Sequence, residues 1–240
     1  MVTTSAVIPI KQLAEAKQRL SGLLNAEERK TLFTAMVSDV LTAVEACTAI
    51  DRIVVVTDDE EVAELAAGFG AECRPEPEVP GLIEAVTESG RQLAAEGVDC
   101  MVFLPGDVPL VSPDELEVVL EGFGLAEQSE FLIVPASDLG GSNCVAVSPP
   151  DCMVYGFGED SFRRHLRLAK EQGIDPQVAK LPGLGLDIDT PDDLKALLEQ
   201  VAADARDGQE SGREYSTVRF LVSSGIAERL ESGEPEAQGK

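Results

Sequence analysis

The chain has 240 residues, of which 44% are hydrophobic, so it is long enough to bury the core of one sizeable α/β domain. Its 19 Lys and Arg residues against 44 Asp and Glu residues give a net charge of −25, which repels nucleic acids and anionic membranes. No window approaches about 18 uncharged apolar residues and no signal sequence is recognisable. We therefore expect a cytoplasmic protein with no nucleic-acid and no membrane partner.

Strands are predicted where short apolar runs rich in β-branched residues occur, at residues 6–10, 53–57, 101–104, 131–134 and 144–147. Helical periodicity lies mainly between them, which predicts helices after the cap residue Asn25 and over residues 59–69, 81–95, 113–120, 161–172 and 191–201. This alternation predicts a three-layer α/β fold with a mostly parallel mixed sheet, formed by residues 1–202.

The remaining residues, 203–240, have a different composition and are predicted to be a linker and a C-terminal tail. Residues 203–214 are rich in Asp, Gly, Ser and Gln, and residues 232–240 are expected to fray. Between these two segments, residues 215–230 have the pattern of a short helix that packs on the domain.

The five cysteines are an odd number, widely spaced and without a C-x-x-C pair. This spacing predicts neither a disulfide framework nor a zinc site. We interpret all five as small hydrophobic residues of the core, namely Cys47, Cys73, Cys100, Cys144 and Cys152.

Three aspartates are candidates for holding a hard cation. Asp187 and Asp189 lie two residues apart in an extended segment, so their carboxylates project from the same face. Asp107 directly follows a predicted buried strand, and strand ends of this kind hold the ligands of open α/β sheets. The alternative for Asp107 is a turn residue, and for Asp189 it is the cap of the helix that follows.

Three cations follow the first strand: Lys11, Lys17 and Arg19. The segment has neither the G-x-G-x-x-G pattern of dinucleotide sites nor a P-loop, so those two classes lose their main support. Cations at this spacing suit a phosphate-binding segment, because Arg offers a planar fork and Lys a movable point charge. The alternative is an ordinary solvated surface.

A third candidate region combines the motif G-G-S-N, which contains Asn143, with the motif F-G-E-D-S-F-R-R-H, which contains Gly158, Ser161 and His165. Glycines permit close backbone approach, and the free N–H groups of the predicted helix favour anions, so a small phosphorylated acid would fit. Ser161 could instead be a plain N-cap residue or a residue of the first helical turn. The single histidine, His165, lacks a Ser or Cys partner at a recognisable spacing. We interpret it as a surface or supporting residue rather than a general base.

Five motifs in this order resemble the guanylyltransferases of coenzyme F420 biosynthesis that act on 2-phospho-L-lactate, phosphoenolpyruvate or 3-phospho-D-glycerate. They are I-P-I-K-Q-L-A-E-A-K-Q-R-L, L-P-G-D-V-P-L, G-G-S-N, F-G-E-D-S-F-R-R-H and L-D-I-D-T-P-D-D-L. The resemblance covers residues 6–201. It implies a nucleotidyltransferase-type fold, GTP as the donor, Mg²⁺ as the cofactor, and transfer of GMP to a small phosphorylated acid with release of pyrophosphate. It is also compatible with a homodimer.

The resemblance assigns roles to individual residues at matching positions. It implies that metal is bound by Asp107, Asp187 and Asp189; that the acid is bound by Lys11, Asn143, Gly158 and Ser161; that the nucleotide is bound by Lys17, Arg19 and Gly106; and that catalysis depends on Lys11, Lys17, Arg19 and Asp107. Asn143 stands where some relatives have Thr. After Gly81 and Leu82 this chain has Ile83 and Glu84, where an Asn is expected near the nucleoside.

Two other functions are compatible with the same residues. One is a nucleotidyltransferase for a sugar phosphate or a molybdopterin, although those enzymes usually carry a glycine-rich first loop. The other is a catalytically silent binding module on the same scaffold. Retention of three acids together with the basic segment argues against the silent module.

Overall fold

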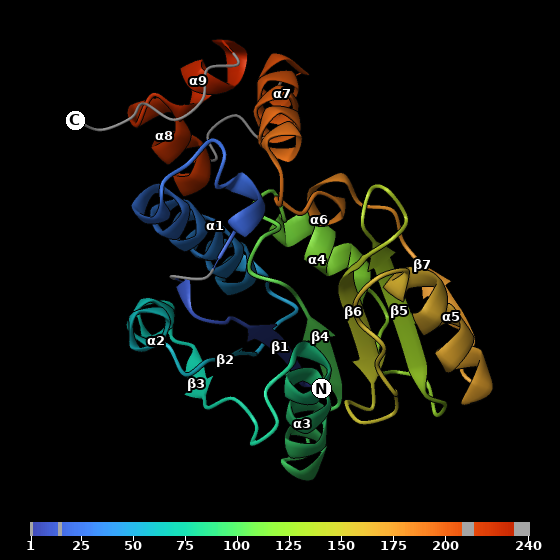
Figure 1. Cartoon of the computed structure of the whole chain (residues 1–240). Coiled ribbons are helices and arrows are strands. Elements are labelled where there is room, and N and C mark those ends of the chain that lie inside the picture. The colour runs from blue at the N-terminus through green and yellow to red at the C-terminus, as the bar shows by residue number, and fades with distance from the viewer. Residues whose placement is uncertain (1, 14–15, 208–213, 233–240) are drawn as a thin grey trace.

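The computed structural model describes residues 2–13, 16–207 and 214–232 (Figure 1). Within these residues one seven-stranded sheet has the order β3-β2-β1-β4-β6-β5-β7. β6 is antiparallel to β4 and β5, and the other pairs are parallel, which confirms the predicted mixed sheet. The strands are β1 (Thr4–Pro9), β2 (Arg52–Val56), β3 (Glu72–Arg74), β4 (Cys100–Phe103), β5 (Glu130–Pro135), β6 (Ser142–Ser148) and β7 (Pro176–Val178).

The sequence did not predict the two edge strands, β3 and β7. Each has only three residues and a mostly exposed pattern, so neither carries the apolar run that marks a buried strand. Their pairing depends on the neighbouring strands β2 and β5, which are distant in sequence.

The predicted helices are present with small shifts at their ends. They are α1 (Ala26–Ala46), α2 (Glu60–Ala67), α3 (Leu82–Ala95), α4 (Pro113–Leu120), α5 (Ser161–Glu171) and α7 (Pro191–Asp207). Asn25 and Glu28 form the expected capping box at the start of α1. Two short elements were not predicted: α6 (Pro182–Gly185) and the 3-10 helix η2 (Gln18–Leu20).

Helices cover both faces of the sheet. Buried residues of α1, α2 and α4 pack with one set of strand side chains, including Ile8 and Val102. Buried residues of α3 and α5 pack with the opposite set, including Val7 and Phe103. The alternation along β1 and β4 follows from the two-residue period of a strand, and both sets are apolar because both faces are covered.

The C-terminal part forms two helices, α8 (Ser216–Ser223) and α9 (Ile226–Ser232), where the sequence predicted one. They pack with α1 and α7 around a separate apolar cluster that contains Leu32, Leu197 and Leu221 (Figure 1). Asp39 of α1 is buried and accepts hydrogen bonds from the backbone N–H groups of Ser216, at 2.7 Å, and Thr217, at 2.9 Å. Helix α7 continues through Asp207, and the rest of the predicted linker and the frayed tail lie largely outside the described residues.

All five cysteines are free thiols. Cys47, Cys100 and Cys144 are buried as expected, but Cys73 is exposed, so the interpretation of every cysteine as a core residue was wrong. Cys73 is exposed because β3 lies at the sheet edge. No helix among the described residues is long and apolar enough to cross a membrane.

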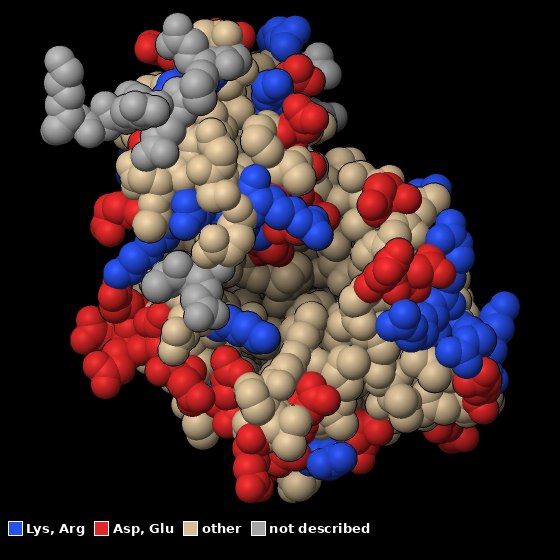
Figure 2. All heavy atoms as spheres, in the orientation of Figure 1, with Lys and Arg blue, Asp and Glu red and all other residues tan. Residues whose placement is uncertain are grey.

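One edge of the sheet gathers the ends of several strands. The carboxyl ends of β1 and β4 meet the start of the antiparallel β6 at this edge. Figure 2 shows a hollow in the face of the molecule with Lys and Arg side chains at its border, although this face also carries many acidic side chains. The expected ligand position at the strand ends is therefore open to solvent.

Candidate active site

The fold brings the two acidic motifs together. Asp107 follows β4, and the backbone N–H of Ile188 donates to the carbonyl oxygen of Asp107 at 3.0 Å. Ile188 is fully buried, so its neighbours Asp187 and Asp189 project from the other side of the extended segment. A backbone hydrogen bond therefore fixes the position of the Asp-x-Asp motif relative to Asp107.

Lys17 lies between two of these carboxylates. Its Nζ is 2.5 Å from Oδ2 of Asp107 and 2.9 Å from Oδ1 of Asp189, and its side chain is only 5% exposed. The ammonium also lies 5.5 Å from the centre of the Phe33 ring, within the range of a cation–π contact. Lys17 is therefore part of the site rather than of a solvated surface.

The backbone of Lys17 is in the left-handed region, with φ 55° and ψ 43°. A lysine pays about 1–3 kcal/mol for this conformation, which persists only where the surroundings enforce it. Here the following 3-10 turn is closed by a hydrogen bond from the N–H of Leu20 to the carbonyl of Lys17 at 2.9 Å, and Leu20 is fully buried. This backbone conformation directs the ammonium of Lys17 toward Asp107 and Asp189.

The charges of the site shift the pKa of Lys17. Burial by itself favours the neutral amine, but the charges of Asp107 and Asp189 outweigh it and raise the pKa of Lys17 above its ordinary value. Arg19 adds a second positive charge at the solvent-exposed side of the site. Its guanidinium is 73% exposed and reaches Asp189 at 3.3 Å, so it remains available to an anionic ligand.

Asp187 is held by an amide rather than by a cation. The Nδ2 of Asn143, at the start of β6, donates to Oδ1 of Asp187 at 3.0 Å. Burial raises the pKa of Asp187, and the neighbouring charges of Asp107 and Asp189 raise it further, whereas the hydrogen bond from Asn143 lowers it. A carboxylate in this setting gains from additional positive charge.

The helix-cap alternative for Asp189 is wrong. Thr190 and Asp193 cap α7 between them: the Asp193 carboxylate accepts from the backbone N–H of Thr190 at 2.7 Å, and the Thr190 hydroxyl accepts from the N–H of Asp193 at 3.3 Å. The carboxylate of Asp189 is therefore left for Lys17 and Arg19.

The donor set suits a hard divalent cation. Carboxylate oxygens are the ligands that Mg²⁺ prefers, and the pKa of Asp187 is raised first by burial and then by the negative charges of Asp107 and Asp189. Among the described residues no three His, Cys, Asp or Glu side chains converge closely enough to enclose a metal ion as they stand. The ammonium of Lys17 holds the position between Asp107 and Asp189 that a cation would share.

The third candidate region lies beside these acids along β6. Asn143 is adjacent to Ser142, whose Oγ is 3.0 Å from Oγ of Ser161 in the first turn of α5. Gly158 is exposed, with φ 106°, in the loop before α5, and its carbonyl accepts from the N–H of Ser161 at 3.1 Å. The structure thus brings Asn143 and Ser161 close together through Ser142.

One residue of this region was missed from the sequence, and for another the sequence left two interpretations open. Ser142 was not singled out within G-G-S-N, and His165 was interpreted as a surface or supporting residue. His165 is fully buried, and its Nδ1 is 2.9 Å from Oγ of Ser142, which excludes the surface alternative. The available signal was the spacing of Ser161 and His165, because residues four apart share one face of a helix.

Lys11 lies apart from the acidic cluster. It is exposed at the end of β1 and lines a small cavity with Glu76, Gly81 and Leu82. Gly106 is buried, and a Cβ at this position would lie 3.1 Å from Val37 of α1. Gly106 therefore allows the turn to pack closely against α1. This packing does not assign a ligand contact to Gly106.

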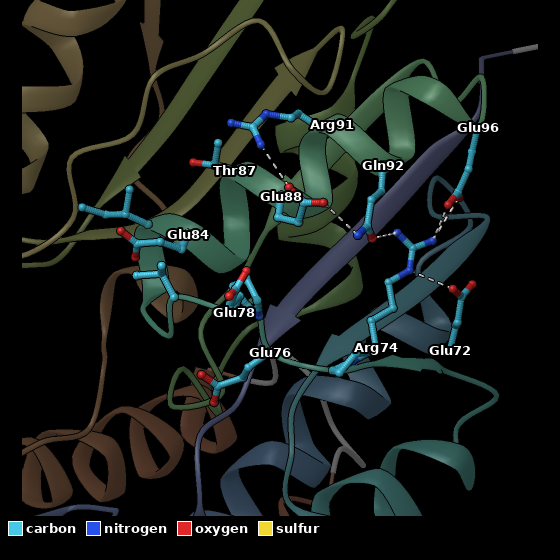
Figure 3. Close-up of a pocket in the computed structure, with 14 residues that line it drawn as sticks. Glu72, Arg74, Glu76, Glu78, Glu84, Thr87, Glu88, Arg91, Gln92 and Glu96 are labelled. Atoms are coloured by element: carbon cyan, nitrogen blue, oxygen red, sulfur yellow. Dashed lines mark hydrogen bonds and ion pairs between the residues drawn. The ribbon is translucent and has the colours of Figure 1, made fainter.

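A wide groove lies elsewhere, between β3 and α3, with a volume of about 820 Å³ (Figure 3). Six glutamates and two arginines line it, and Arg74 is held by Glu72, Gln92 and Glu96. Ile83 and Glu84, where the sequence departs from the expected Asn, lie at this groove. Its acidic lining does not suit a triphosphate, so the functional site is the smaller cluster at the strand ends.

Solved structures with the same architecture are nucleotidyltransferases and related enzymes. A protein from Desulfovibrio desulfuricans G20, assigned as a nucleotide-diphospho-sugar transferase, superposes with a TM-score of 0.74 over 96% of this chain and 99% of that chain, at 16% identity. This likeness defines the fold. The chain therefore shares the three-layer α/β fold of this transferase, and it carries carboxylates and cations at its strand ends.

The chain belongs to the family described as guanylyl transferase CofC like, which it matches over residues 4–221. It is 38% identical to a phosphoenolpyruvate guanylyltransferase from Conexibacter woesei, covering 84% of this chain and 90% of the relative. It is 33% identical to a 3-phospho-D-glycerate guanylyltransferase from Colwellia psychrerythraea, covering 81% of this chain and 90% of the relative. The resemblance stated from the five motifs is thereby confirmed.

Proposed function

We propose that this protein is a guanylyltransferase that transfers GMP from GTP to a small phosphorylated three-carbon acid in coenzyme F420 biosynthesis. The observation that carries the proposal is the buried ammonium of Lys17 between Asp107 and Asp189, at the strand ends of a chain that belongs to a guanylyltransferase family. The relative with 38% identity acts on phosphoenolpyruvate, which makes phosphoenolpyruvate the first acceptor to test.

In the proposed reaction a phosphate oxygen of the acceptor attacks the α-phosphorus of GTP in line. The new O–P bond forms as the bond from the α-phosphorus to the bridging oxygen breaks, and pyrophosphate leaves with that electron pair. The acceptor phosphate is already ionised, so no strong base is needed. The main barrier is the approach of two anions, which at about 4 Å costs roughly 4 kcal/mol at an effective dielectric constant of about 20.

In this proposal the cations of the chain offset that repulsion. Lys17 is fixed at the acids, Arg19 extends toward solvent, and Lys11 stands at the end of β1. Asp107, Asp187 and Asp189 would hold Mg²⁺, which would supply positive charge to the phosphate oxygens. Asn143, Gly158 and Ser161 are assigned to the acid, and Gly106, Lys17 and Arg19 to the nucleotide.

The setting proposed for this reaction is the cytoplasm. The five thiols are all free, as is usual in a reducing compartment, and the negative charge of the chain does not suit anionic membranes. A homodimer is also compatible with the proposal, and sedimentation velocity of the purified chain tests it.

The direct test is pyrophosphate release with Mg²⁺ and each of three acids: phosphoenolpyruvate, 3-phospho-D-glycerate and 2-phospho-L-lactate. Each acid is offered with GTP and separately with ATP and CTP. We expect release with one acid and GTP only. Release with CTP or ATP instead would reject the guanylyl donor, and GTP binding without release from any acid would favour the silent binding module.

A variant pair tests the site itself. Asp107→Asn should lower turnover by at least about 100-fold, because it removes a carboxylate at the centre of the charge cluster. Asp114→Asn on α4 is the matched control, since Asp114 is exposed and lies away from the acids. Near-normal turnover of Asp107→Asn at saturating Mg²⁺ would contradict the assigned role.

A further inference from the structure

The strongest unassigned feature is the buried imidazole of His165 on α5. The residue is fully buried, and its ring lies 4.8 Å from the Phe157 ring and near the rings of Phe131 and Tyr155. An imidazole placed among aromatic rings must satisfy both of its nitrogens with hydrogen bonds, or the fold loses stability. Both nitrogens have partners, and these partners decide which nitrogen carries the proton.

The backbone fixes the tautomer. The N–H of Gly156 lies 2.9 Å from Nε2 of His165, and because a backbone N–H can only donate, Nε2 must be the unprotonated nitrogen. Burial, together with the neighbouring charge of Arg164, lowers the pKa of His165 to about 4, although a backbone hydrogen bond with Ser161 acts in the opposite direction. The ring is therefore neutral at pH 7, and its single proton is on Nδ1.

This proton sets the direction of two hydroxyl groups. Nδ1–H donates to Oγ of Ser142 at 2.9 Å, and Oγ of Ser142 lies 3.0 Å from Oγ of Ser161. The two hydroxyls have two hydrogens between them, and one of these forms the bond that joins them. The second hydroxyl hydrogen can therefore be donated to an acceptor other than His165, Ser142 or Ser161.

The position of this donor matches the site. Ser142 is half-buried, whereas Ser161 is only 2% exposed, so the outward donor is more accessible from Ser142. Ser142 is also the direct neighbour of Asn143, whose amide holds Asp187. Ser142 thus connects Asn143 and Ser161, the two side chains that the resemblance assigns to the acid, so an acid held by both would lie next to the hydroxyl of Ser142.

We propose that Ser142 binds an anionic oxygen of the phosphorylated acid and that His165 is a positioning residue, which acts through Ser142 and Ser161. This inference rests on the proposed function. Because Gly156 prevents the imidazole from accepting a proton from Ser142, the hydroxyl pair presents a donor outward, and a donor recognises a carboxylate or phosphate oxygen. The arrangement selects an anion without placing a positive charge in the buried layer.

The tautomer can be measured without any turnover. His165 is the only histidine of the sequence, so ¹⁵N–¹H NMR of the imidazole of an untagged protein gives one unambiguous set of signals. We expect the proton on Nδ1 at pH 7 and a shift of the Nδ1–H signal when phosphoenolpyruvate, 3-phospho-D-glycerate or 2-phospho-L-lactate is added. A proton on Nε2, a charged ring, or no shift with any of the three acids would overturn the inference.

Steady-state kinetics test the role of the hydroxyl pair. Ser142→Ala should raise KM for the acid by about tenfold and leave KM for GTP within about twofold, because one hydrogen bond to a charged group is lost. Ser148→Ala is the matched control, since Ser148 lies at the far end of the same strand and donates to the carbonyl of Asp99. An unchanged KM for the acid, or an equal rise in both KM values, would overturn the assignment.

Two substitutions at His165 separate positioning from packing. His165→Asn retains an N–H donor close to the position of Nδ1, whereas His165→Phe keeps a ring and has no donor. We expect KM for the acid to rise by about tenfold in the Phe variant and by less than about threefold in the Asn variant. Equal effects of both variants would mean that His165 serves packing alone.

The outcomes separate this inference from the proposed function. A wild-type protein that releases no pyrophosphate with any acid, yet shows the Nδ1–H shift on addition of an acid, would retain the binding role and reject the transfer reaction. A protein that turns over normally with no shift and an unchanged KM in Ser142→Ala would retain the reaction and reject the inference. If His165→Phe fails to fold, Ser142→Ala still decides the question.

Discussion

Lys17→Met should tighten the binding of Mg²⁺ to the substrate-free protein while it lowers turnover. Methionine keeps the length of the buried stem and removes the charge that lies 2.5 Å from Asp107 and 2.9 Å from Asp189. In the wild-type protein a divalent cation must compete with this ammonium for the same two carboxylates. In the variant the carboxylates are unpaired and repel each other, so they gain more from the metal.

The expected size follows from the two contacts. A hydrogen bond between charged groups contributes about 1.5–3 kcal/mol, and the contact to Asp189 is at the low end because that carboxylate is 39% exposed. Loss of this competition should lower the Kd for Mg²⁺ by about ten- to one hundredfold. Turnover should fall by at least about 100-fold, because a buried cation no longer offsets the charge of the phosphates.

Isothermal titration of Mg²⁺ into the nucleotide-free protein measures the first effect, and pyrophosphate release measures the second. Lys30→Met is the matched control, because Lys30 pairs with Glu61 on the surface, away from the acids. It should change neither quantity by more than about twofold. A Kd for Mg²⁺ that is unchanged or weaker in Lys17→Met would refute the competition between the ammonium and the metal.

Three further predictions concern stability. Asp187→Asn should abolish turnover yet raise Tm by a few degrees. The pKa of Asp187 is raised in the folded protein, so its ionised form destabilises the fold once the pH exceeds the ordinary pKa of a carboxyl group. Burial holds the pKa of His165 at about 4, below the value of 6.5 in an unfolded chain. The contribution of the neutral imidazole to the free energy of unfolding is therefore complete above pH 6.5 and is lost as pH falls toward 4. His165→Phe should remove about 3 kcal/mol of this acid sensitivity from urea unfolding measured between those pH values. Asp39→Ala should cost about 1–2 kcal/mol in urea unfolding, because the first N–H groups of α8 at Ser216 and Thr217 lose their acceptor, and Asp39→Asn should cost less.

Each of these predictions can fail on its own. A lower Tm for Asp187→Asn would mean that its bond from Asn143 outweighs burial. An acid sensitivity that persists in His165→Phe would assign it to carboxylates elsewhere in the chain. Unfolding of Asp39→Ala that matches the wild type would mean that the apolar contacts of α8 hold it to α1 without the cap.

The sequence was sufficient to predict the strands and helices whose own residues follow a recognisable pattern. The five central strands were predicted from local apolar runs, α1 from its cap residue and α4 from its helical periodicity, because these patterns depend only on neighbouring residues. The short edge strands β3 and β7 were missed, since their pairing depends on a partner strand rather than on their own composition.

The candidate site was likewise predicted only in part from the sequence. The sequence supplied the three acids and the basic segment as separate motifs, each with a structural alternative. The tertiary structure joined them: Ile188 bonds to the backbone of Asp107, and Lys17, in a left-handed conformation, lies between Asp107 and Asp189. The alternative role of Asp189 as a cap was excluded only by the observation that Thr190 and Asp193 cap α7 between them.

By itself, the sequence determined the class of the fold and the chemistry available to the protein, because strand periodicity, helix caps and the supply of carboxylates and cations are local properties. Only the tertiary structure decided that Lys17 is buried and paired, that Asn143 holds Asp187, and that His165 orients Ser142 from inside the core. These pairs are separated by 90, 44 and 23 residues. Their contacts depend on how the helices close over the sheet, and no local pattern encodes that.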